Sequence, residues 1–412
     1  MTRVALISFH TSPLAQPGSG DSGGMNVYVR EVASSLAHAG IECTTFTRAD
    51  RPALPRELLV EPGHTVVHLP AGPHDAPKEA LPAYVDVFAD RVGEHIAEMG
   101  GVDVVHGNYW LSGVVGHRLK HQLDLPLVST FHTLARVKAE GGDLEPEWRD
   151  GAEADIIACS DAICVSCPEE ESQFRRLYGH PVDGSINGVL EIVPPAVDHA
   201  FFAPGDRGGA RRAVGLPADR PVVLFVGRLQ PLKGPDVAVR TLAPMERDDA
   251  VLVLVGGASG ADGAEELART RAAVAQLGLG DRVRFVDPKP HHLLSTYYRA
   301  ADVVVVPSRS ESFGLVALEA AACGIPVVAG AVGGLLNVVV DGVTGLLVAD
   351  RDPAGFAAAI DRLLGAPGER AAMGAAATAR ARGFTWSLTA ARLRRLYADL
   401  AEQRLPLVST CA

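Results

Sequence analysis

The sequence predicts an α/β protein made of two doubly wound domains, each a mostly parallel sheet with helices on both faces. Its 412 residues exceed what one core comfortably holds. Short apolar runs alternate with amphipathic helical patterns along most of the chain, as expected for parallel sheets. The alternation breaks into a Pro/Gly-rich stretch at 194–209, a typical linker composition. We therefore expect domains at 1–200 and 201–384, and a helix at 385–412 that packs back towards the first domain.

In the first domain the apolar runs predict buried strands and the runs between them predict helices. The expected strands lie at 3–8, 43–47, 66–70, 102–106, 126–132, 161–167 and 192–194. The expected helices lie at 25–39, 79–99, 111–123, 147–159 and 168–178. Ligands of such sheets bind at the carboxyl ends of the strands. The site candidates are therefore His10, His106 with Asn108 and Tyr109, and His132 with Thr133.

The second domain repeats this alternation and ends in a helical tail. Its expected strands lie at 221–227, 250–256, 283–287, 302–307, 326–330 and 345–348. Its expected helices lie at 235–244, 262–277 and 291–300, and the tail is read as helices at 353–364, 367–382 and 385–402. The last of these has an apolar stripe that requires a packing partner.

Composition excludes several classes of protein. The net charge of -11 leaves no domain-wide basic surface, which argues against a nucleic-acid binder. No apolar run reaches about 18 residues, so no membrane span is expected. The six cysteines are scattered through apolar segments, and we expect reduced, packed thiols in a cytoplasmic protein. They are Cys43, Cys159, Cys164, Cys167, Cys323 and Cys411.

The stretch Ser308–Gly324 carries the strongest chemical signal. It follows an expected strand and opens a helix near Phe313, so its first amides would favour a phosphate. Glu311 and Glu319 would repel that phosphate, but they would accept hydrogen bonds from sugar hydroxyls. A ligand with both phosphates and hydroxyls would bind to the amides and to the two carboxylates together. The alternative is that both glutamates are ordinary solvated residues.

Two cations follow the first strand of the second domain. Arg228 and Lys233 lie in G-R-L-Q-P-L-K-G, at the same sheet edge as Ser308–Gly324. Cations that converge there suit a diphosphate. A solvated loop pair is the alternative reading.

A long Gly-rich loop, residues 10–24, follows the first strand. Loops of this length in compact domains are commonly functional. Gly23 and Gly24 precede a helix, where backbone could approach a phosphate or a sugar. The loop is not G-x-G-x-x-G, which disfavours a dinucleotide-dependent dehydrogenase.

With these motifs the chain resembles the retaining glycosyltransferases of family 4, which have the GT-B architecture of two Rossmann-like domains. The resemblance rests on G-R-L-Q-P-L-K-G (227–234), E-S-F-G-L-V-A-L-E-A (311–320) and A-V-G-G-L (331–335). The segment 10–29 resembles more specifically the enzymes that begin mycothiol biosynthesis. That implies transfer of N-acetylglucosamine from UDP-GlcNAc to 1D-myo-inositol 3-phosphate.

The resemblance also implies roles for individual residues. Catalysis would involve Arg228, Lys233, His132 and Glu311. The donor site would comprise Gln16, Pro17, Gly24, Arg228, Lys233, Lys289, Glu311, Phe313, Gly314, Leu315 and Glu319. The acceptor site would comprise His10, Asp21, Ser22, Gly23, Gly24, Met25, Asn26, Lys78, Tyr109, Thr133 and Arg149. No cofactor is needed for catalysis, and a structural Mg²⁺ would be held by main-chain groups of Tyr298, Arg299, Ala301 and Ile325.

The acceptor remains open at this point, because Gly107, Asn108 and Leu336 depart from the pattern of the mycothiol enzymes. A different cyclitol or sugar phosphate, as in sucrose-phosphate-synthase-like enzymes, is one alternative. A nucleotide-sugar-binding protein without turnover is another. The expected partners are a nucleotide-sugar donor and a small phosphorylated acceptor, and a homodimer is the default assembly.

Overall fold

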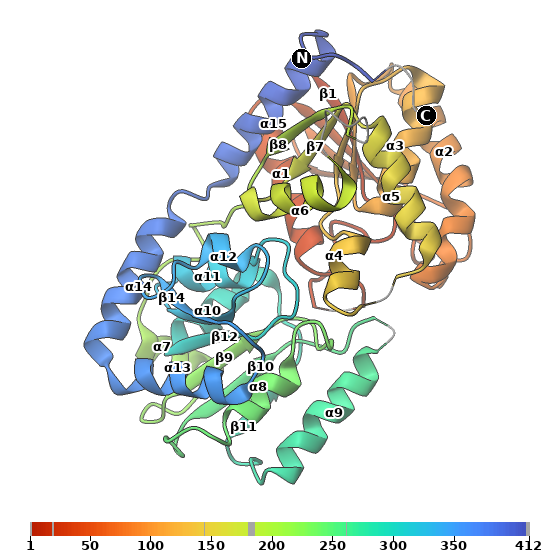
Figure 1. The fold of residues 1–412 in the computed structure, drawn as a ribbon. Helices are drawn as coiled ribbons and strands as arrows, with labels where there is room; N and C mark the ends of the chain where they lie inside the picture. Colours follow the sequence, from red (N-terminus) through yellow and green to blue (C-terminus); the bar gives the residue numbers. More distant parts are fainter. Residues whose placement is uncertain (1, 19, 144, 180–185, 261, 409–412) are drawn as a thin grey trace. The chain divides into compact units, whose positions relative to one another are not determined.

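The computed structural model describes residues 2–18, 20–143, 145–179, 186–260 and 262–408 (Figure 1). It contains two compact units, which are described separately below. Unit 1 comprises Met1–Ala15, Met25–Pro194 and Trp386–Ala412, and unit 2 comprises Gln16–Gly24 and Pro195–Thr385. The short segment Gln16–Gly24 thus belongs to unit 2, although its neighbours in the sequence belong to unit 1.

Unit 1 is built on a sheet with the strand order β3-β4-β2-β1-β5-β6-β7-β8 among the described residues. All neighbouring strands are parallel except β3 and β4, which pair antiparallel. The strands are β1 (Arg3–Ile7), β2 (Glu42–Arg48), β3 (Glu57–Glu61), β4 (His64–Leu69), β5 (Val104–Asn108), β6 (Leu127–Thr130), β7 (Ala162–Val165) and β8 (Val189–Ile192).

Helices cover this sheet on both faces, so its central strands are buried. Every residue of β5, β6 and β7 is buried, as expected for a parallel sheet with helices on each side. The helices are α1 (Gly24–His38), η1 (Lys78–Tyr84), α2 (Val85–Glu98), α3 (Trp110–Leu123), α4 (Ala135–Glu140), α5 (Glu147–Cys159), α6 (Pro168–Tyr178) and α15 (Trp386–Ala401).

The last helix, α15, is part of unit 1 although it comes from the far end of the chain. Its Tyr397 hydroxyl lies 2.6 Å from Nδ1 of His106 in β5, and its Thr389 donates to the Pro194 carbonyl at 2.8 Å. Trp386 contacts the ring of Tyr28 edge-on. Figure 1 shows α15 beside β8, whose Ile192 carbonyl accepts from Arg392 at 2.6 Å.

Unit 2 has a fully parallel sheet with the strand order β11-β10-β9-β12-β13-β14 among the described residues. The strands are β9 (Val222–Val226), β10 (Val251–Val255), β11 (Val283–Val286), β12 (Val303–Val306), β13 (Val327–Gly330) and β14 (Gly345–Val348). The helices are α7 (Arg207–Val214), α8 (Pro235–Thr241), α9 (Gly263–Gln276), η3 (His291–Leu293), α10 (Leu294–Ala300), α11 (Leu315–Ala322), α12 (Leu335–Val338), α13 (Pro353–Gly365) and α14 (Pro367–Ala381).

The structure departs from the expected elements in several places, and the short helices α4 and α12 are two of the elements that were not predicted. Strand β3 was not predicted, and α7 lies partly within the stretch expected to be linker. The side chain of Asp206 caps α7 by accepting from the amides of Gly208 and Gly209 at 3.0 and 2.9 Å. This capping offsets the low helix propensity of the two glycines.

The cysteines also correct one expectation. Cys43, Cys164 and Cys323 are buried free thiols, and burial raises the pKa of each to about 12. Cys159, however, is disulfide-bonded, so the prediction of reduced thiols throughout is wrong for this residue. Cys411 lies outside the described residues.

Among the described residues, no helix combines the length and the hydropathy that crossing a membrane requires.

Candidate functional site

The turn that joins β12 to α11 is the centre of the candidate donor site in unit 2. Gly314 caps α11 with a φ of 99°, a conformation that glycine adopts without strain. The helix therefore begins at Leu315, two residues later than the sequence predicted. The amides at the start of α11 lack partners within the helix, so this end favours an anion. Phe313 anchors the turn through its buried ring, 5.8 Å from the ring of Phe384.

The backbone of the segment A-V-G-G-L (331–335) packs directly against this turn. The amide of Gly334 donates to the carbonyl of Glu311 at 2.8 Å. A Cβ at Gly334 would lie only 2.3 Å from Cα of Phe313, and one at Gly333 would lie 2.0 Å from the Glu311 carbonyl oxygen. The two glycines are therefore required because the backbones of two loops touch.

We expect Gly334→Ala to displace the turn and to weaken UDP binding at least about tenfold, with a loss of about 1–3 kcal/mol in unfolding free energy from overpacking. The clashing atoms are backbone, so no side-chain rotation relieves them. Calorimetric titration with UDP and urea unfolding measure the two effects. Gly368→Ala in α14 is the matched control, because its Cβ meets nothing within 4 Å. Wild-type UDP affinity in Gly334→Ala would contradict this role.

Lys233 and Glu311 lie together beside the turn. The Lys233 Nζ is 2.6 Å from Oε2 of Glu311, and both side chains are about one-fifth exposed (22% and 18%). The hydroxyl of Ser308 also donates to this carboxylate, at 3.3 Å. The structure therefore brings the predicted phosphate-binding cation and the predicted sugar-binding carboxylate into direct contact.

Glu319 is buried rather than exposed, which removes the alternative that it is a solvated helix position. The Tyr298 hydroxyl donates to its Oε2 at 2.7 Å, and Nε2 of His291 lies 2.7 Å from its Oε1. Burial and the neighbouring carboxylate raise the pKa of Tyr298, so its phenol keeps the donated proton. Each carboxylate oxygen retains a second lone pair for a ligand hydroxyl.

His291 is a site residue that the sequence analysis missed. It begins η3, shortly after β11, and thus lies near the carboxyl edge of the sheet. Its partner Glu319 is 28 residues away in the sequence. The sequence offered one indication of its role: His291 lies two residues after Lys289, a donor-site candidate that also follows β11.

The glycine-rich segment Gln16–Gly24 contacts three other parts of unit 2: the loop that follows β9, the start of α11 and the loop that follows β10. A Cβ at Gly23 would lie 3.2 Å from Nε of Arg228, and one at Gly24 would lie 3.2 Å from Cδ1 of Leu315. The Ser259 hydroxyl donates to the carbonyl of Gly20. The donor candidates Gln16 and Pro17 therefore belong to the same unit as Arg228.

The acceptor candidates of unit 1 gather around the ring of Tyr109. The Lys78 ammonium lies 4.8 Å from the ring centroid, and the Arg149 guanidinium lies 5.3 Å from it. The His10 ring centroid is 4.5 Å from that of Tyr109. Arg149 also donates to the hydroxyl and carbonyl of Thr133, both at 3.2 Å. Two cations, a phenol and a hydroxyl thus meet at the carboxyl edge of this sheet, a set suited to a phosphate.

Arg149 is 2% exposed. Its guanidinium is held by two carboxylates, one from a residue four positions before it in the sequence and one from a residue four positions after it. Its Nε lies 2.9 Å from Oε1 of Glu153, and its Nη1 lies 2.9 Å from Oε2 of Glu145. Glu153 is fully buried and also accepts from the Ala135 amide at 2.8 Å. These contacts fix the guanidinium in one orientation.

His132 follows β6 and its ring contacts Asn108. Nε2 of His132 lies 3.1 Å from Oδ1 of Asn108, and its backbone has a φ of 59°. Desolvation lowers the pKa of His132 to about 3, so the ring is neutral at neutral pH. His106 points elsewhere: both its ring nitrogens contact hydroxyls, of Tyr397 and Thr130. It serves the packing of unit 1 rather than the site.

The remaining acceptor candidates divide between the two units. His10, Met25 and Asn26 belong to unit 1, whereas Asp21–Gly24 belongs to unit 2. The side-chain amide of Asn26 donates to the Thr11 hydroxyl at 2.9 Å and to the Ser12 carbonyl at 2.7 Å. Asn26 thereby holds the start of the glycine-rich loop.

The proposed main-chain magnesium site lies at the end of α10. Tyr298 and Arg299 are in the last turn of that helix, whose final carbonyls have no partners within the helix. The Tyr298 carbonyl accepts from the Ala301 amide at 3.0 Å and keeps a second lone pair. A carbonyl oxygen of this kind is a ligand type that hard cations take, so the Tyr298 carbonyl fits the ion in chemical type.

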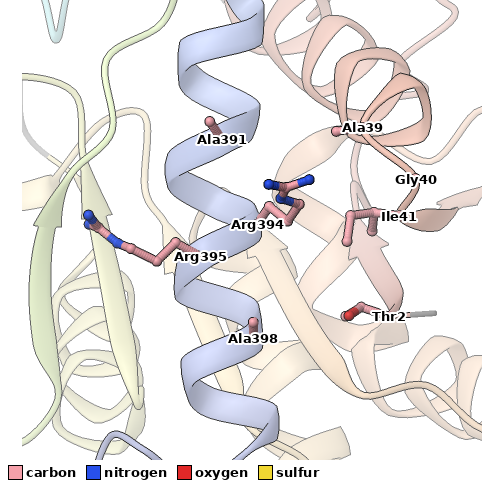
Figure 2. A pocket seen from close by; sticks show the side chains of 8 residues that line it. All are labelled: Thr2, Ala39, Gly40, Ile41, Ala391, Arg394, Arg395 and Ala398. Atoms are coloured by element: carbon pink, nitrogen blue, oxygen red, sulfur yellow. The ribbon is translucent and has the colours of Figure 1, made fainter.

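A pocket of about 510 Å³ lies elsewhere in unit 1. It is lined by Thr2, Ala39, Gly40, Ile41, Ala391, Arg394, Arg395 and Ala398. Figure 2 shows Arg394 extending towards Ala39 and Ile41, whereas Arg395 points away. Thr2 and Ile41 precede β1 and β2, so the pocket is at the amino ends of the strands, opposite to the ligand edge.

Two family profiles match the chain. The profile described as "Glycosyl transferase 4-like domain" covers residues 23–184, and that described as "Glycosyl transferases group 1" covers residues 206–380. The D-inositol 3-phosphate glycosyltransferase of Acidothermus cellulolyticus is 49% identical over 98% of this chain and 91% of its own length. A protein of the same name from Kribbella flavida is 46% identical, over 98% of this chain and 96% of its own length.

Solved structures show the same fold. Sucrose-phosphate synthase from Thermosynechococcus elongatus superposes with a TM-score of 0.91 at 36% identity, over 98% of this chain and all of that one. HepE from Anabaena, solved in complex with UDP and glucose, has a TM-score of 0.78 at 19% identity, over 97% of this chain and all of its own.

Proposed function

Because this chain belongs to the family 4 retaining glycosyltransferases of GT-B architecture, we propose that it transfers N-acetylglucosamine from UDP-GlcNAc to 1D-myo-inositol 3-phosphate. The observation that carries this proposal is the cluster around Tyr109, where Lys78, Thr133 and Arg149 meet. A phosphorylated acceptor would satisfy that cluster. The names of the Acidothermus and Kribbella relatives support the same acceptor.

The donor would bind in unit 2. Arg228 and Lys233 would hold the diphosphate with the first amides of α11, and Glu319 would accept from the ribose hydroxyls. Glu311 would accept a hydrogen bond from a hydroxyl of the donor sugar. The sugar would then lie beside the Lys233 ammonium, because Glu311 contacts that ammonium. The Lys233 ammonium has three donors, so it can hold phosphate and Glu311 together. Gln16, Pro17 and Lys289 would complete the donor site.

The reaction would be a substitution on one face of the sugar. The bond between the anomeric carbon and the diphosphate oxygen breaks as the bond from that carbon to the acceptor hydroxyl forms. The proton of that hydroxyl passes to the departing phosphate oxygen, so no separate base is needed. Arg228, Lys233 and the α11 amides would stabilise the negative charge on the leaving UDP, the interaction that usually contributes most to catalysis.

His132 would orient the donor sugar through a neutral imidazole. Its low pKa means that the ring carries no charge at neutral pH, so it would act by hydrogen bonding. His10, Met25, Asn26 and residues 21–24 would surround the inositol ring.

Catalysis would need no metal ion, because protein cations and amides supply the charge stabilisation. A Mg²⁺ bound to main-chain groups of Tyr298, Arg299, Ala301 and Ile325 would hold the end of α10 in place. We also propose a homodimer, since twofold dimers are the commonest assemblies. A cytoplasmic location is proposed from the free thiols of Cys43, Cys164 and Cys323, and it requires the disulfide of Cys159 to be reduced there.

A second acceptor class has a specific observation in its favour. The sucrose-phosphate synthase that superposes at 36% identity supports a sugar phosphate in place of inositol phosphate. The phosphate-binding cluster would suit either acceptor, and the ring pocket would decide between them.

A coupled assay of UDP release with UDP-GlcNAc tests the proposal. The acceptor panel is 1D-myo-inositol 3-phosphate, myo-inositol and fructose 6-phosphate. We expect release with inositol 3-phosphate and a far lower kcat/KM with the other two. If UDP is released with fructose 6-phosphate and not with the two inositol compounds, the acceptor is a sugar phosphate. UDP-GlcNAc binding without release on any acceptor would indicate a binding protein without turnover.

A further inference from the structure

Three metal-ligating side chains meet in unit 1, one of them exposed, one partly buried and one fully buried. They are His117 and His121 of α3 and Cys159, the last residue of α5. One ligand atom from each lies within 4.8 Å of the other two. Nε2 of His121 is 3.2 Å from Sγ of Cys159, and the two imidazole centroids are 5.0 Å apart.

Helix packing explains why these side chains converge. His117 and His121 are four residues apart, so they occupy the same face of α3. Figure 1 shows α3 and α5 side by side. Gly113, one turn before His117, allows close approach, since a Cβ there would lie 3.0 Å from Cδ1 of Ile156. Cys159 follows Ile156 by one turn, and it therefore faces the two histidines.

We propose that His117, His121 and the reduced thiolate of Cys159 bind one thiophilic divalent cation, with Zn²⁺ the best fit and water as the fourth ligand. Zn²⁺ prefers tetrahedral sites of imidazole and thiolate, with Zn–N of about 2.0–2.1 Å and Zn–S of about 2.3 Å. Those bond lengths place N and S ligands about 3.5 Å apart in a tetrahedron. The observed 3.2 Å is close to that separation.

The positive charge that Lys120 brings near this cluster is already paired with a carboxylate. The Lys120 ammonium is engaged by Oδ1 of Asp161 at 2.7 Å and by the Cys159 carbonyl at 3.0 Å. It therefore holds the end of α5 in place through the backbone. Asp155, an exposed acid one turn earlier on α5, lies near His117 and would offset part of the added positive charge.

Metal binding at this site is coupled to the redox state of Cys159. The residue is disulfide-bonded in the structure, and a disulfide sulfur is not a thiolate ligand. Two molecules of a low-molecular-weight thiol would reduce the disulfide, giving two protein thiols and one small-molecule disulfide. The Cys159 thiol would then release its proton to solvent as the S–Zn bond forms. The site would thus be open to metal only in the reduced protein.

The test uses the full chain, reduced with dithiothreitol and freed of it without air, and titrated with Co²⁺ and then Zn²⁺. We expect one metal per chain and an intense thiolate-to-cobalt charge-transfer band in the reduced protein. His121→Ala should bind Zn²⁺ at least about tenfold more weakly, about 1.4 kcal/mol. His121 is exposed, so this variant keeps its fold. Cys159→Ser should lose the cobalt band.

His38→Ala is the matched control, since His38 is an exposed histidine of unit 1 that pairs with Glu61. It should bind Zn²⁺ as the wild type does. The air-oxidised wild-type chain should show no cobalt band. The proposal is overturned if the reduced wild type binds no more tightly than His121→Ala. Equal binding by Cys159→Ser or by the oxidised chain would overturn it as well.

Discussion

Lys233→Ala is expected to lower kcat by about 10²–10³, the usual cost of removing one donor that stabilises charge developing in the transition state. The alanine variant would lose this cation and would also leave Glu311 without its partner at 2.6 Å. An unpaired carboxylate beside a diphosphate would repel it. Steady-state kinetics with saturating acceptor, together with UDP titration, separate the effect on turnover from the effect on donor binding.

The control for this variant is Arg362→Ala, which removes an exposed cation of unit 2 that pairs with Glu369. It should leave kcat unchanged. The double variant Lys233→Ala with Glu311→Gln separates the two contributions, because it removes the repulsive carboxylate charge as well. Near-normal turnover in Lys233→Ala would remove this residue from the catalytic set.

Arg149→Ala should have two large effects that need separate measurements. Loss of a charge-assisted hydrogen bond, about 1.5–3 kcal/mol, should lower kcat/KM for the phosphorylated acceptor by about 10–150-fold. Fully buried Glu153 would also lose its ion-pair partner, and breaking a buried pair costs about 3–5 kcal/mol of unfolding free energy. Urea unfolding and acceptor kinetics report the two effects.

Lys78→Ala isolates the effect on the acceptor, because Lys78 is only half-buried and its described contact is with the Tyr109 ring. It should raise the acceptor KM with little change in unfolding free energy. Arg176→Ala, which removes an exposed partner of Glu140, is the matched control for both variants. If Arg149→Ala and Lys78→Ala alter the KM of UDP-GlcNAc and not that of the acceptor, the acceptor site has been misplaced.

The fold was predictable because its central strands are continuous apolar runs. The run 302–307 predicted a buried strand, and β12 occupies Val303–Val306 with every residue buried. Strand β3 was missed because it lies at the sheet edge, where Leu59 is 67% exposed and burial imposes no clear pattern. Helix α7 was missed because its two glycines mimic a linker, while the Asp206 cap that offsets them is a local contact.

The candidate site was predictable only in part. Glu311, Glu319 and Lys233 lie in motifs whose chemistry can be read locally, and the structure brings Lys233 to Glu311. His291 contacts Glu319 through the fold, and no local pattern announces that pairing. By pattern alone Lys78 is an ordinary surface lysine, and only the family resemblance placed it with Tyr109.

The position of α15 has a consequence for how the chain folds during synthesis. Domains commonly fold in the order in which the ribosome produces them. The sheet of unit 1 is made first, yet the Tyr397 hydroxyl that contacts buried His106 is made almost last. Until residues 386–401 have left the ribosome tunnel, unit 1 lacks one covering helix and exposes the apolar surface beneath it. The domain translated first is therefore expected to be the last to complete its fold, and a truncation before Trp386 should leave it open to aggregation.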